Sequence, residues 1–557
     1  MSGKIRFYLD DWLFNSGLVG FYNILKKSED SVVVGKDYLE FEIEVLENFE
    51  EKYFNYFIST YEKNLTWYKI ISFENTIKYY EEKQFEGFDD KALKTLNKYI
   101  SDVAKKFIKS NSYLAAFEFL GTKEEMLSLE KQLTPLKVKK NQDLKDIIPD
   151  VRNTFDVLKE IINYLNRRDV KKYVAAKNVI YSIINKAWNG ICFLNPQTKE
   201  KDMYKDYKEY FVKPAMDYFN EDKSKYKYDC FTCDEKIKDM TNDLGFLNAI
   251  GFDVKRKASH VWNFNNDISV CPLCKLIYSC VPAGFSYAID SGIYVNDNFS
   301  MSNAIGINSK IKTEVLETTD TNRSLTYRAL VESIKEQFTE STKYELADVQ
   351  VVRYVNEKYR FNILTKNILE LIYKCKTELN NLISSGYKEI NTYFNIYDIV
   401  LDSLFNSQNL YLLMHKMLLY KLTDYNNCYF YGKQINSVMK INYNFMRRLG
   451  YMEKVKNYIV DKGRDEGKNL RLGYGKNTDK LSGISYRLLN ALKVNDVDMF
   501  MDTVLNCYLY VKKSVPPILL EVLKDEDAFK TVGYAFTSGL IEGQDNIKNM
   551  EVGKDDK

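Results

Sequence analysis

The sequence predicts an α+β protein that is predominantly helical, and three observations support that fold class. Apolar residues recur every three or four positions over most of the chain, as they do in amphipathic helices. Residues 38–45 instead alternate apolar and acidic side chains, which is typical of a half-buried strand. Two CxxC pairs in the middle add the pattern of a metal site. We therefore expect a small N-terminal β-hairpin region, a four-cysteine zinc-knuckle insertion and a C-terminal helical bundle.

The first part of the chain predicts one helix and one hairpin. Residues 12–25, WLFNSGLVGFYNIL, predict a short helix that is interrupted at Gly17 and Gly20. A glycine-containing turn then separates residues 32–34 from residues 38–45. The strict alternation in the second of these runs predicts a β-hairpin with one solvated face.

The middle of the chain predicts mostly helices. Residues 153–188 have helical spacing and follow an exposed connector that ends at Pro149. Residues 327–424 contain no proline, and their apolar residues again recur at helical spacing. We expect a long series of helices there.

The chain is long enough to require more than one domain, because its 557 residues exceed what one hydrophobic core organises. Residues 1–425 are predicted to form an N-terminal α+β domain, with a zinc-binding segment at about residues 226–285. Residues 426–557 are predicted to form the helical bundle, in which Asp496 caps a helix.

The overall charge identifies no partner. The chain has 80 lysines and arginines against 77 acidic residues, a net charge of +3, so any nucleic-acid surface must come from local segregation of charge. The start lacks the features of a secretory signal, and no apolar run approaches the roughly 18 residues of a membrane span. We expect a cytoplasmic protein with reduced thiols and no membrane partner.

Two CxxC motifs predict a metal site with four cysteine ligands. Cys230 and Cys233 are separated by 37 residues from Cys271 and Cys274. Two such knuckles supply a tetrahedral set of thiolates, which suits one structural Zn²⁺ per chain. The alternative is a set of redox or core cysteines, but no βαβ pattern of a thioredoxin-like fold surrounds them. The remaining cysteines are interpreted as core residues: Cys192, Cys280, Cys375, Cys428 and Cys507.

The segment between the knuckles combines cations with aromatic and amide side chains. Lys255, Arg256 and Lys257 can neutralise phosphates, and Trp262 can stack on a base or wedge between bases. We predict that these four residues bind nucleic acid. The alternative is a solvated loop in which Trp262 packs against the knuckle.

A second candidate nucleic-acid surface lies in the basic stretch of residues 431–487. This stretch contains 13 lysines and arginines against 5 acidic residues, an excess larger than that of the whole chain. Such a stretch suits a groove that follows a nucleic-acid backbone. The candidate contacts are Arg447, Arg448, Lys468 and Arg471. The alternative is an ordinary solvated helix face.

Catalytic motifs are missing from the sequence. The two histidines, His260 and His415, cannot form a multi-histidine metal centre, and His415 is interpreted as a core residue. Neither a P-loop nor a nucleophile elbow occurs. We therefore expect a binding protein with no enzyme activity. Two alternatives stay open: a zinc-ribbon nucleic-acid-processing enzyme, and a structural interaction protein that contacts no nucleic acid.

Five segments together carry a resemblance to a known family: WLFNSGLVGFY near the start, NGICFLNP at 189–196, KRKASHVWNF at 255–264, CPLCKLIYSCVPAGF at 271–285 and ISYRLLNAL at 484–492. With these segments the chain resembles the CXXC–CXXC family of large subunits of type I-B CRISPR Cascade complexes. The likeness spans most of the chain. The CxxC pairs alone occur in many zinc proteins, so the combination is what makes it specific.

The resemblance implies a role in antiviral defence as the non-catalytic large subunit of a ribonucleoprotein complex. Such a subunit recognises the motif that flanks the target, stabilises the R-loop and recruits a helicase-nuclease. Its partners would be CRISPR RNA, target double-stranded DNA, the other Cascade subunits and the helicase-nuclease. Base pairing with the guide RNA would recognise the target sequence, and the protein would recognise the motif that flanks it. The resemblance also suggests a small subunit made by internal translation, for which Met452 is a candidate start.

Overall fold

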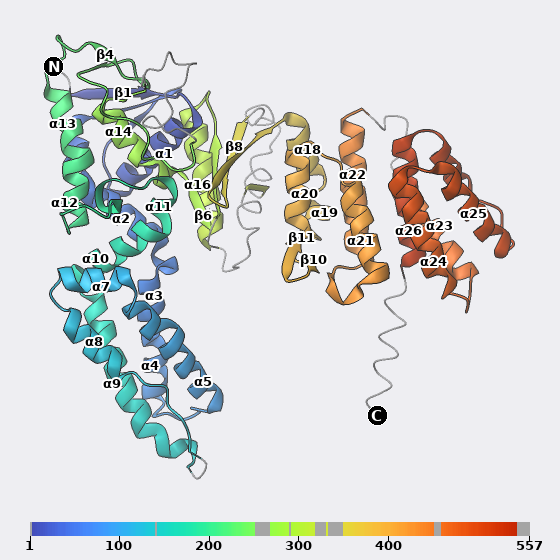
Figure 1. Cartoon of the computed structure of the whole chain (residues 1–557), viewed down its shortest axis with the longest axis horizontal. Coiled ribbons are helices and arrows are strands. Elements are labelled where there is room, and N and C mark those ends of the chain that lie inside the picture. Colours follow the sequence, from blue (N-terminus) through green and yellow to red (C-terminus); the bar gives the residue numbers. More distant parts are fainter. Residues whose placement is uncertain are drawn as a thin grey trace. The chain divides into compact units, whose positions relative to one another are not determined.

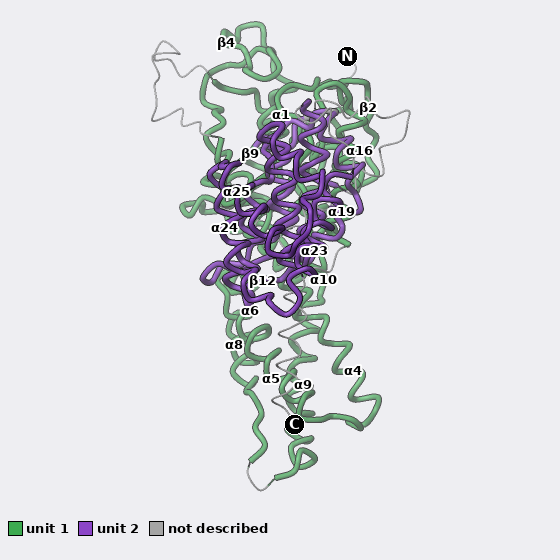
Figure 2. Tube along the Cα trace, turned by 90° about the vertical axis from the view of Figure 1, so that its right-hand side faces the viewer, with its two compact units in different colours: residues 1–319, 352–360 green, residues 320–351, 361–557 purple. Residues whose placement is uncertain are grey.

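The computed structural model describes residues 3–139, 142–250, 268–288, 291–317, 330–331, 349–450 and 458–542. The chain forms two compact units, which are coloured separately in Figure 2. Unit 1 comprises residues 1–319 and 352–360, and unit 2 comprises residues 320–351 and 361–557. Helices predominate in both units and the sheets are small, which confirms the predicted fold class (Figure 1). No described helix combines the length and the apolar character needed to cross a membrane.

Unit 1 begins with a three-stranded antiparallel sheet of order β1-β3-β2. Its strands are β1 (Lys4–Tyr8), β2 (Val33–Val34) and β3 (Tyr38–Glu42). The predicted hairpin is formed by β2 and β3, although β3 ends at Glu42 and a 3-10 helix η1 (Ile43–Leu46) follows. The sequence did not reveal β1, which pairs with the other edge of β3.

Helix α1 (Trp12–Lys27) starts at Asp11, whose carboxylate accepts hydrogen bonds from the backbone N–H groups of Leu13 and Phe14. The predicted interruption at Gly17 and Gly20 is wrong, because α1 is continuous through both. These glycines instead permit close packing against α14 (Pro272–Ser279) and α15 (Val281–Gly284). A Cβ atom on Gly20 would lie 2.0 Å from the carbonyl oxygen of Cys280.

The other helices of unit 1 form one hydrophobic core with α1, α14 and α15. The predicted helical stretch 153–188 is present as three helices, with a break at Arg167 and a π-helical segment η5 (Ile180–Ile184). The helices are α2 (Phe49–Tyr61), α3 (Thr66–Ile71), α4 (Glu74–Glu82), α5 (Asp90–Tyr99), α6 (Lys106–Ile108), α7 (Asn111–Phe119), α8 (Lys123–Gln132), α9 (Ile148–Asn166), α10 (Arg168–Val179), α11 (Asn185–Ala187), α12 (Met203–Tyr207), α13 (Lys213–Asn220) and α16 (Met301–Glu317).

A four-stranded sheet of order β6-β7-β8-β9 follows. Its strands are β6 (Ser286–Ala288), β7 (Ser291–Asn296), β8 (Val349–Val355) and β9 (Lys358–Leu364). The expected series of helices over residues 327–424 is wrong for β8 and β9, and for β10 (Gly386–Glu389) and β11 (Thr392–Asn395). These strands are only four to seven residues long, too short to show a clear two-residue period beside the longer helical pattern around them.

Unit 2 combines a sheet of order β11-β10-β12 with a helical bundle. Asp496 caps α25 (Val497–Tyr510) as predicted, since its carboxylate accepts a 2.8 Å hydrogen bond from the N–H of Met499. The remaining elements are β12 (Cys428–Tyr429), α18 (Lys366–Lys374), α19 (Lys376–Asn380), α20 (Ile396–Phe405), α21 (Tyr411–Thr423), α22 (Gly432–Arg448), α23 (Ile459–Gly473), α24 (Lys480–Val494), α25 (Val497–Tyr510), η10 (Pro517–Leu523) and α26 (Glu526–Ile541).

Helix α26 is the centre of this bundle and is almost entirely buried. It packs against α21, α22, α23 and α24. The boundary predicted between residues 425 and 426 therefore falls inside unit 2, because α21 precedes that position and packs against the helices that follow it.

Candidate metal centre

The first knuckle is a tight turn between β4 (Tyr228–Asp229) and β5 (Lys236–Ile237). The N–H of Cys230 donates to the carbonyl of Glu235 at 2.8 Å, and the N–H of Asp234 donates to the carbonyl of Cys230 at 3.0 Å. Asp234 adopts a left-handed backbone conformation, with φ of 59°. This turn brings Cys230 and Cys233 to the same side of the hairpin.

The second knuckle is the N-terminus of α14. Cys271 is the N-cap residue, and its Sγ accepts a 3.3 Å hydrogen bond from the N–H of Cys274. Pro272 occupies the first helical turn, where its missing N–H leaves no unsatisfied donor. The N–H of Cys271 donates to Sγ of Cys230 at 3.1 Å, which joins the two knuckles.

The four predicted ligands form one cluster. The Sγ atoms of Cys230, Cys233, Cys271 and Cys274 all lie within 4.8 Å of one another, and those of Cys233 and Cys271 are 3.7 Å apart. Zn–S bonds of about 2.3 Å in a tetrahedron place the sulfur atoms about 3.8 Å apart. The cluster therefore has the dimensions of a four-thiolate metal site, and the residues fit zinc.

The protonation of the cluster also favours a cation. Contacts with the Cys233, Cys271 and Cys274 thiols lower the pKa of Cys230. Contacts with Cys230 raise the pKa of Cys271, and burial raises the pKa of Cys274. Adjacent buried sulfur atoms cannot all ionise without compensation, and a divalent cation supplies that positive charge.

The core of unit 1 fixes the orientation of α14. The carbonyl of Ser279, the last residue of this helix, accepts hydrogen bonds from Tyr53 at 2.9 Å and from the indole of Trp188 at 3.1 Å. The Ser279 hydroxyl contacts the hydroxyl of Tyr207 at 2.6 Å. Cys280 is fully buried and lies outside the sulfur cluster, which confirms its interpretation as a core residue.

The sequence predicted nucleic-acid contacts in the segment between the knuckles. Lys255, Arg256, Lys257 and Trp262 lie outside the described residues, as does the candidate internal start Met452. Both ends of that segment are described, at Cys233 and Cys271, and they meet at the sulfur cluster.

The basic stretch of residues 431–487 makes many contacts within unit 2. Arg448 pairs with Glu370 at 2.5 Å, and Lys468 pairs with Glu542 at 3.3 Å. The guanidinium of Arg471 donates to the carbonyl of Leu540 at 2.9 Å, and burial lowers its pKa. Arg447 is exposed at the end of α22. Nucleic-acid binding by Arg447, Arg448, Lys468 and Arg471 stays a prediction.

His415 is a core residue, as the sequence indicated. It lies in α21, and its Nδ1 atom is buried without a hydrogen-bond partner among the described residues. Burial lowers its pKa, so the ring is neutral in the folded chain at neutral pH.

Sequence reasoning missed one feature of unit 1, a cavity of about 690 Å³. Its lining includes Asn189, Phe193, Leu194, Asn195 and Pro196, which belong to the NGICFLNP segment. A glycine and a proline close to two asparagines are typical of a loop with defined turns, and this pattern could have been recognised in the sequence.

The fold and the cluster define a predominantly helical α+β protein with four clustered cysteines that could hold a metal ion. Residues 223–286, which contain both knuckles together with α14 and α15, match the family model for CRISPR-associated protein (Cas_CXXC_CXXC). No curated protein and no solved structure matches the chain. The matched segment supports a CRISPR-associated role.

Proposed function

We propose that this chain is the non-catalytic large subunit of a type I-B Cascade, a DNA surveillance complex that is guided by CRISPR RNA. In this role it recognises the motif that flanks the target, stabilises the R-loop and recruits a helicase-nuclease. The observation that carries the proposal is the family match across residues 223–286, the segment that forms the metal centre.

The packing of unit 1 extends the support beyond the matched residues. The segment at residues 12–22, which contributes to the resemblance, packs directly on α14 and α15 within the matched segment. A Cβ atom on Gly284 would lie 2.0 Å from the carbonyl oxygen of Ser16. Such a close approach requires small residues on both helices. The two segments therefore form one structural unit.

The ligand set favours a structural metal over a catalytic one. Four cysteine ligands fill the tetrahedral coordination of zinc and leave no position for water or substrate. Among the described residues, the four thiols are the only cluster of three or more side chains suited to hold a metal. Both points favour a binding subunit over the alternative of a zinc-ribbon nucleic-acid-processing enzyme.

Reconstitution tests this proposal. The chain should bind target double-stranded DNA specifically only when the guide RNA and the partner subunits are present, and it should retain the helicase-nuclease in a pull-down with the assembled complex. Metal-dependent cleavage of DNA or RNA by the purified chain would instead support the enzyme alternative. Undiminished DNA binding by a complex that lacks this chain would support a purely structural protein.

The basic residues between the two knuckles provide a more specific test. The triple variant Lys255→Ala/Arg256→Ala/Lys257→Ala should assemble normally but bind target DNA more weakly. Each lost phosphate contact should reduce the slope of log affinity against log salt by about one. A triple variant with the salt slope of the unmodified complex would exclude these three residues from the DNA site.

A further inference from the structure

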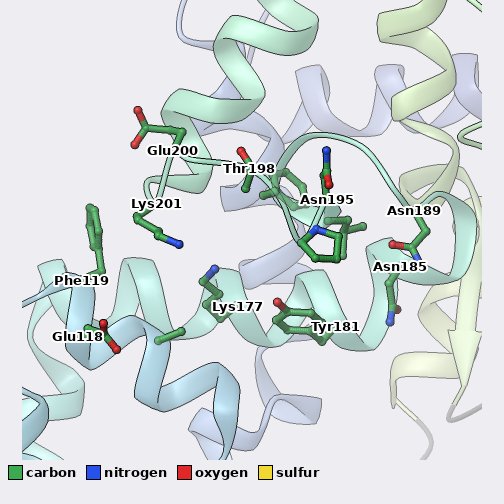
Figure 3. Close-up of a pocket in the computed structure, with 14 residues that line it drawn as sticks. Glu118, Phe119, Lys177, Tyr181, Asn185, Asn189, Asn195, Thr198, Glu200 and Lys201 are labelled. Atoms are coloured by element: carbon green, nitrogen blue, oxygen red, sulfur yellow. The ribbon is translucent and has the colours of Figure 1, made fainter.

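The proposal concerns the cavity of about 690 Å³ in unit 1. Its lining residues come from α7, α10, η5, α11 and the segment before α12 (Figure 3). In that segment Gly190 and Cys192 both adopt left-handed backbone conformations, with φ of 77° and 50°. Hydrogen bonds of 3.0 Å from Leu194 to Ile191 and 2.8 Å from Asn195 to Cys192 hold the turn. The volume is within the usual range of small-molecule sites, about 300–1,000 Å³.

Two lysines from different elements place positive charge at the cavity. Figure 3 shows Lys177 on α10 and Lys201 before α12 extending toward the same space. Burial lowers the pKa of Lys177, and repulsion by Lys201 adds to that effect, whereas the nearby carboxylate of Asp206 opposes it. Lys201 in turn helps to lower the pKa of Glu118. The cavity therefore suits an anion, and lysine is a common phosphate ligand.

The two carboxylates of the lining already have cationic partners. Glu118 pairs with Lys123 at 2.9 Å, and Glu200 pairs with Lys205 at 2.8 Å. Hydrogen bonds from these lysines lower the pKa of both carboxyl groups. Both carboxylates thus form ion pairs with lysines outside the lining, and Lys177 and Lys201 are the cations of the lining that a ligand would meet.

The rest of the lining suits a planar ring with polar edges. The ring of Tyr181 is 52% exposed, and it lies one helical turn beyond Lys177. Asn185, Asn189 and Asn195 line the same cavity, and the Oδ1 atom of Asn185 is buried without a hydrogen-bond partner among the described residues. Aromatic rings stack on nucleobases, and asparagine amides pair with the edges of bases.

We propose that this cavity binds one nucleotide unit, with its phosphate between Lys177 and Lys201 and its base against Tyr181 and the asparagine amides. The nucleotide is either free or part of a single-stranded nucleic acid, since both present the same phosphate and base. All residues of this site come from the chain itself, so the proposed binding does not depend on the proposed role in a guided complex.

The test uses the full chain without partner subunits. Isothermal titration measures binding of the ribonucleoside and deoxyribonucleoside monophosphates, the matching nucleosides, inorganic phosphate and a single-stranded pentanucleotide. A monophosphate should bind at least about tenfold more tightly than its nucleoside, because the nucleoside lacks the phosphate contact. A monophosphate that binds as tightly as the pentanucleotide identifies a free nucleotide as the ligand, and a tighter pentanucleotide identifies a strand.

Matched variants assign the binding to this cavity. Lys177→Met/Lys201→Met should weaken monophosphate binding by about tenfold or more, whereas Lys199→Met, on the same segment but outside the lining, should change it little. Tyr181→Leu should weaken binding of the nucleotide but not of inorganic phosphate. Glu118→Gln should tighten binding, because it removes a negative charge from the lining.

Three results would overturn the proposal. The first is the absence of monophosphate binding at millimolar concentration. The second is unchanged binding by the Lys177→Met/Lys201→Met variant when its far-ultraviolet circular dichroism matches that of the unmodified chain. The third is a Tyr181→Leu variant that loses nucleotide and phosphate affinity equally, since the site would then recognise only an anion. Failure of the chain to assemble with guide RNA would refute the proposed function and leave this site unaffected.

Discussion

Cys271 links local structure to the candidate metal centre. It caps α14 through its sulfur atom, and its N–H donates to the sulfur of Cys230 in the other knuckle. The Cys271 sulfur is also 3.7 Å from the sulfur of Cys233. A metal at this cluster would therefore hold the β4–β5 hairpin to the start of α14, and its binding free energy would be folding free energy.

The double variant Cys230→Ser/Cys271→Ser is expected to lose its zinc. Elemental analysis of the unmodified chain should give about one zinc per chain, as a closed four-thiolate site requires. The variant should contain almost none, and its melting temperature should fall because metal binding stabilises the fold. Cys428→Ser, outside the cluster, is the control and should retain both properties. A double variant that still carries one zinc per chain would refute this ligand assignment.

Lys312 should make the stability of the chain depend on pH. It lies buried in α16, where its ammonium group donates to the hydroxyl of Tyr56 at 2.7 Å and to the carbonyl of Ala283 at 2.5 Å. Burial lowers its pKa to about 7, against about 10.4 in an unfolded chain. Between these values the unfolded chain binds more protons, so the free energy of unfolding should rise with pH from about 7 to about 10, by a few kcal/mol at most.

Urea unfolding of the variant Lys312→Met, measured from pH 6 to 10, tests this dependence. The methionine does not titrate, so the variant should lack the part of the rise above pH 7 that the unmodified chain shows. Lys310→Met, an exposed position on the same helix, is the control and should follow the unmodified chain. Identical pH profiles for Lys312→Met and the unmodified chain would show that Lys312 has an ordinary pKa.

At the scale of elements, the packing of α1 on α14 and α15 depends on glycine. A Cβ atom on Gly17 would lie 2.6 Å from the carbonyl oxygen of Ile277, and one on Gly20 would lie 2.0 Å from that of Cys280. Backbone atoms occupy both places and cannot move aside as a side chain would. The helix that carries the N-terminal motif is therefore fixed against the helix that follows the second CxxC pair.

Gly20→Ala is expected to destabilise unit 1 by about 1–3 kcal/mol, the usual range for overpacking a close contact. Gly306→Ala in α16 is the control, because no atom lies within 4 Å of its added Cβ. The control should be neutral or stabilising by about 0.5–1 kcal/mol, since alanine restricts the unfolded chain. Urea denaturation of both variants measures the difference. Equal stability for Gly20→Ala and the unmodified chain would contradict the tight helix packing.

The elements that sequence periodicity predicted correctly are the ones with long or locally specified patterns. Helix α25 has both an apolar stripe and the capping residue Asp496, and each CxxC pair specifies its own turn. The strand β1 was missed because its five residues pair with β3, about thirty residues later, and the residues next to β1 do not indicate which strand it pairs with. The continuity of α1 was missed because the glycines serve packing across helices, which a single sequence does not display.

At the scale of the whole molecule, the boundary between the units follows long-range packing. Residues 352–360 belong to unit 1, although residues 320–351 before them belong to unit 2. Domain boundaries are usually recognised in a sequence by a linker rich in proline, glycine or polar residues. Where the chain passes back and forth between two units, as it does here, such a linker is not expected at each crossing. The position of α21 in unit 2 follows in the same way from its contacts with α22, α24 and α26.

The two units should unfold in separate transitions, because each has its own buried core. The sulfur cluster lies in unit 1, so a zinc chelator should lower the melting temperature of only one of two calorimetric transitions. Gly467→Ala should lower only the other, because a Cβ atom there would lie 2.0 Å from the carbonyl oxygen of Phe536 in the α23–α26 packing of unit 2. A single transition that both treatments shift equally would show instead that the units unfold together, and that the metal contributes to the stability of the whole chain.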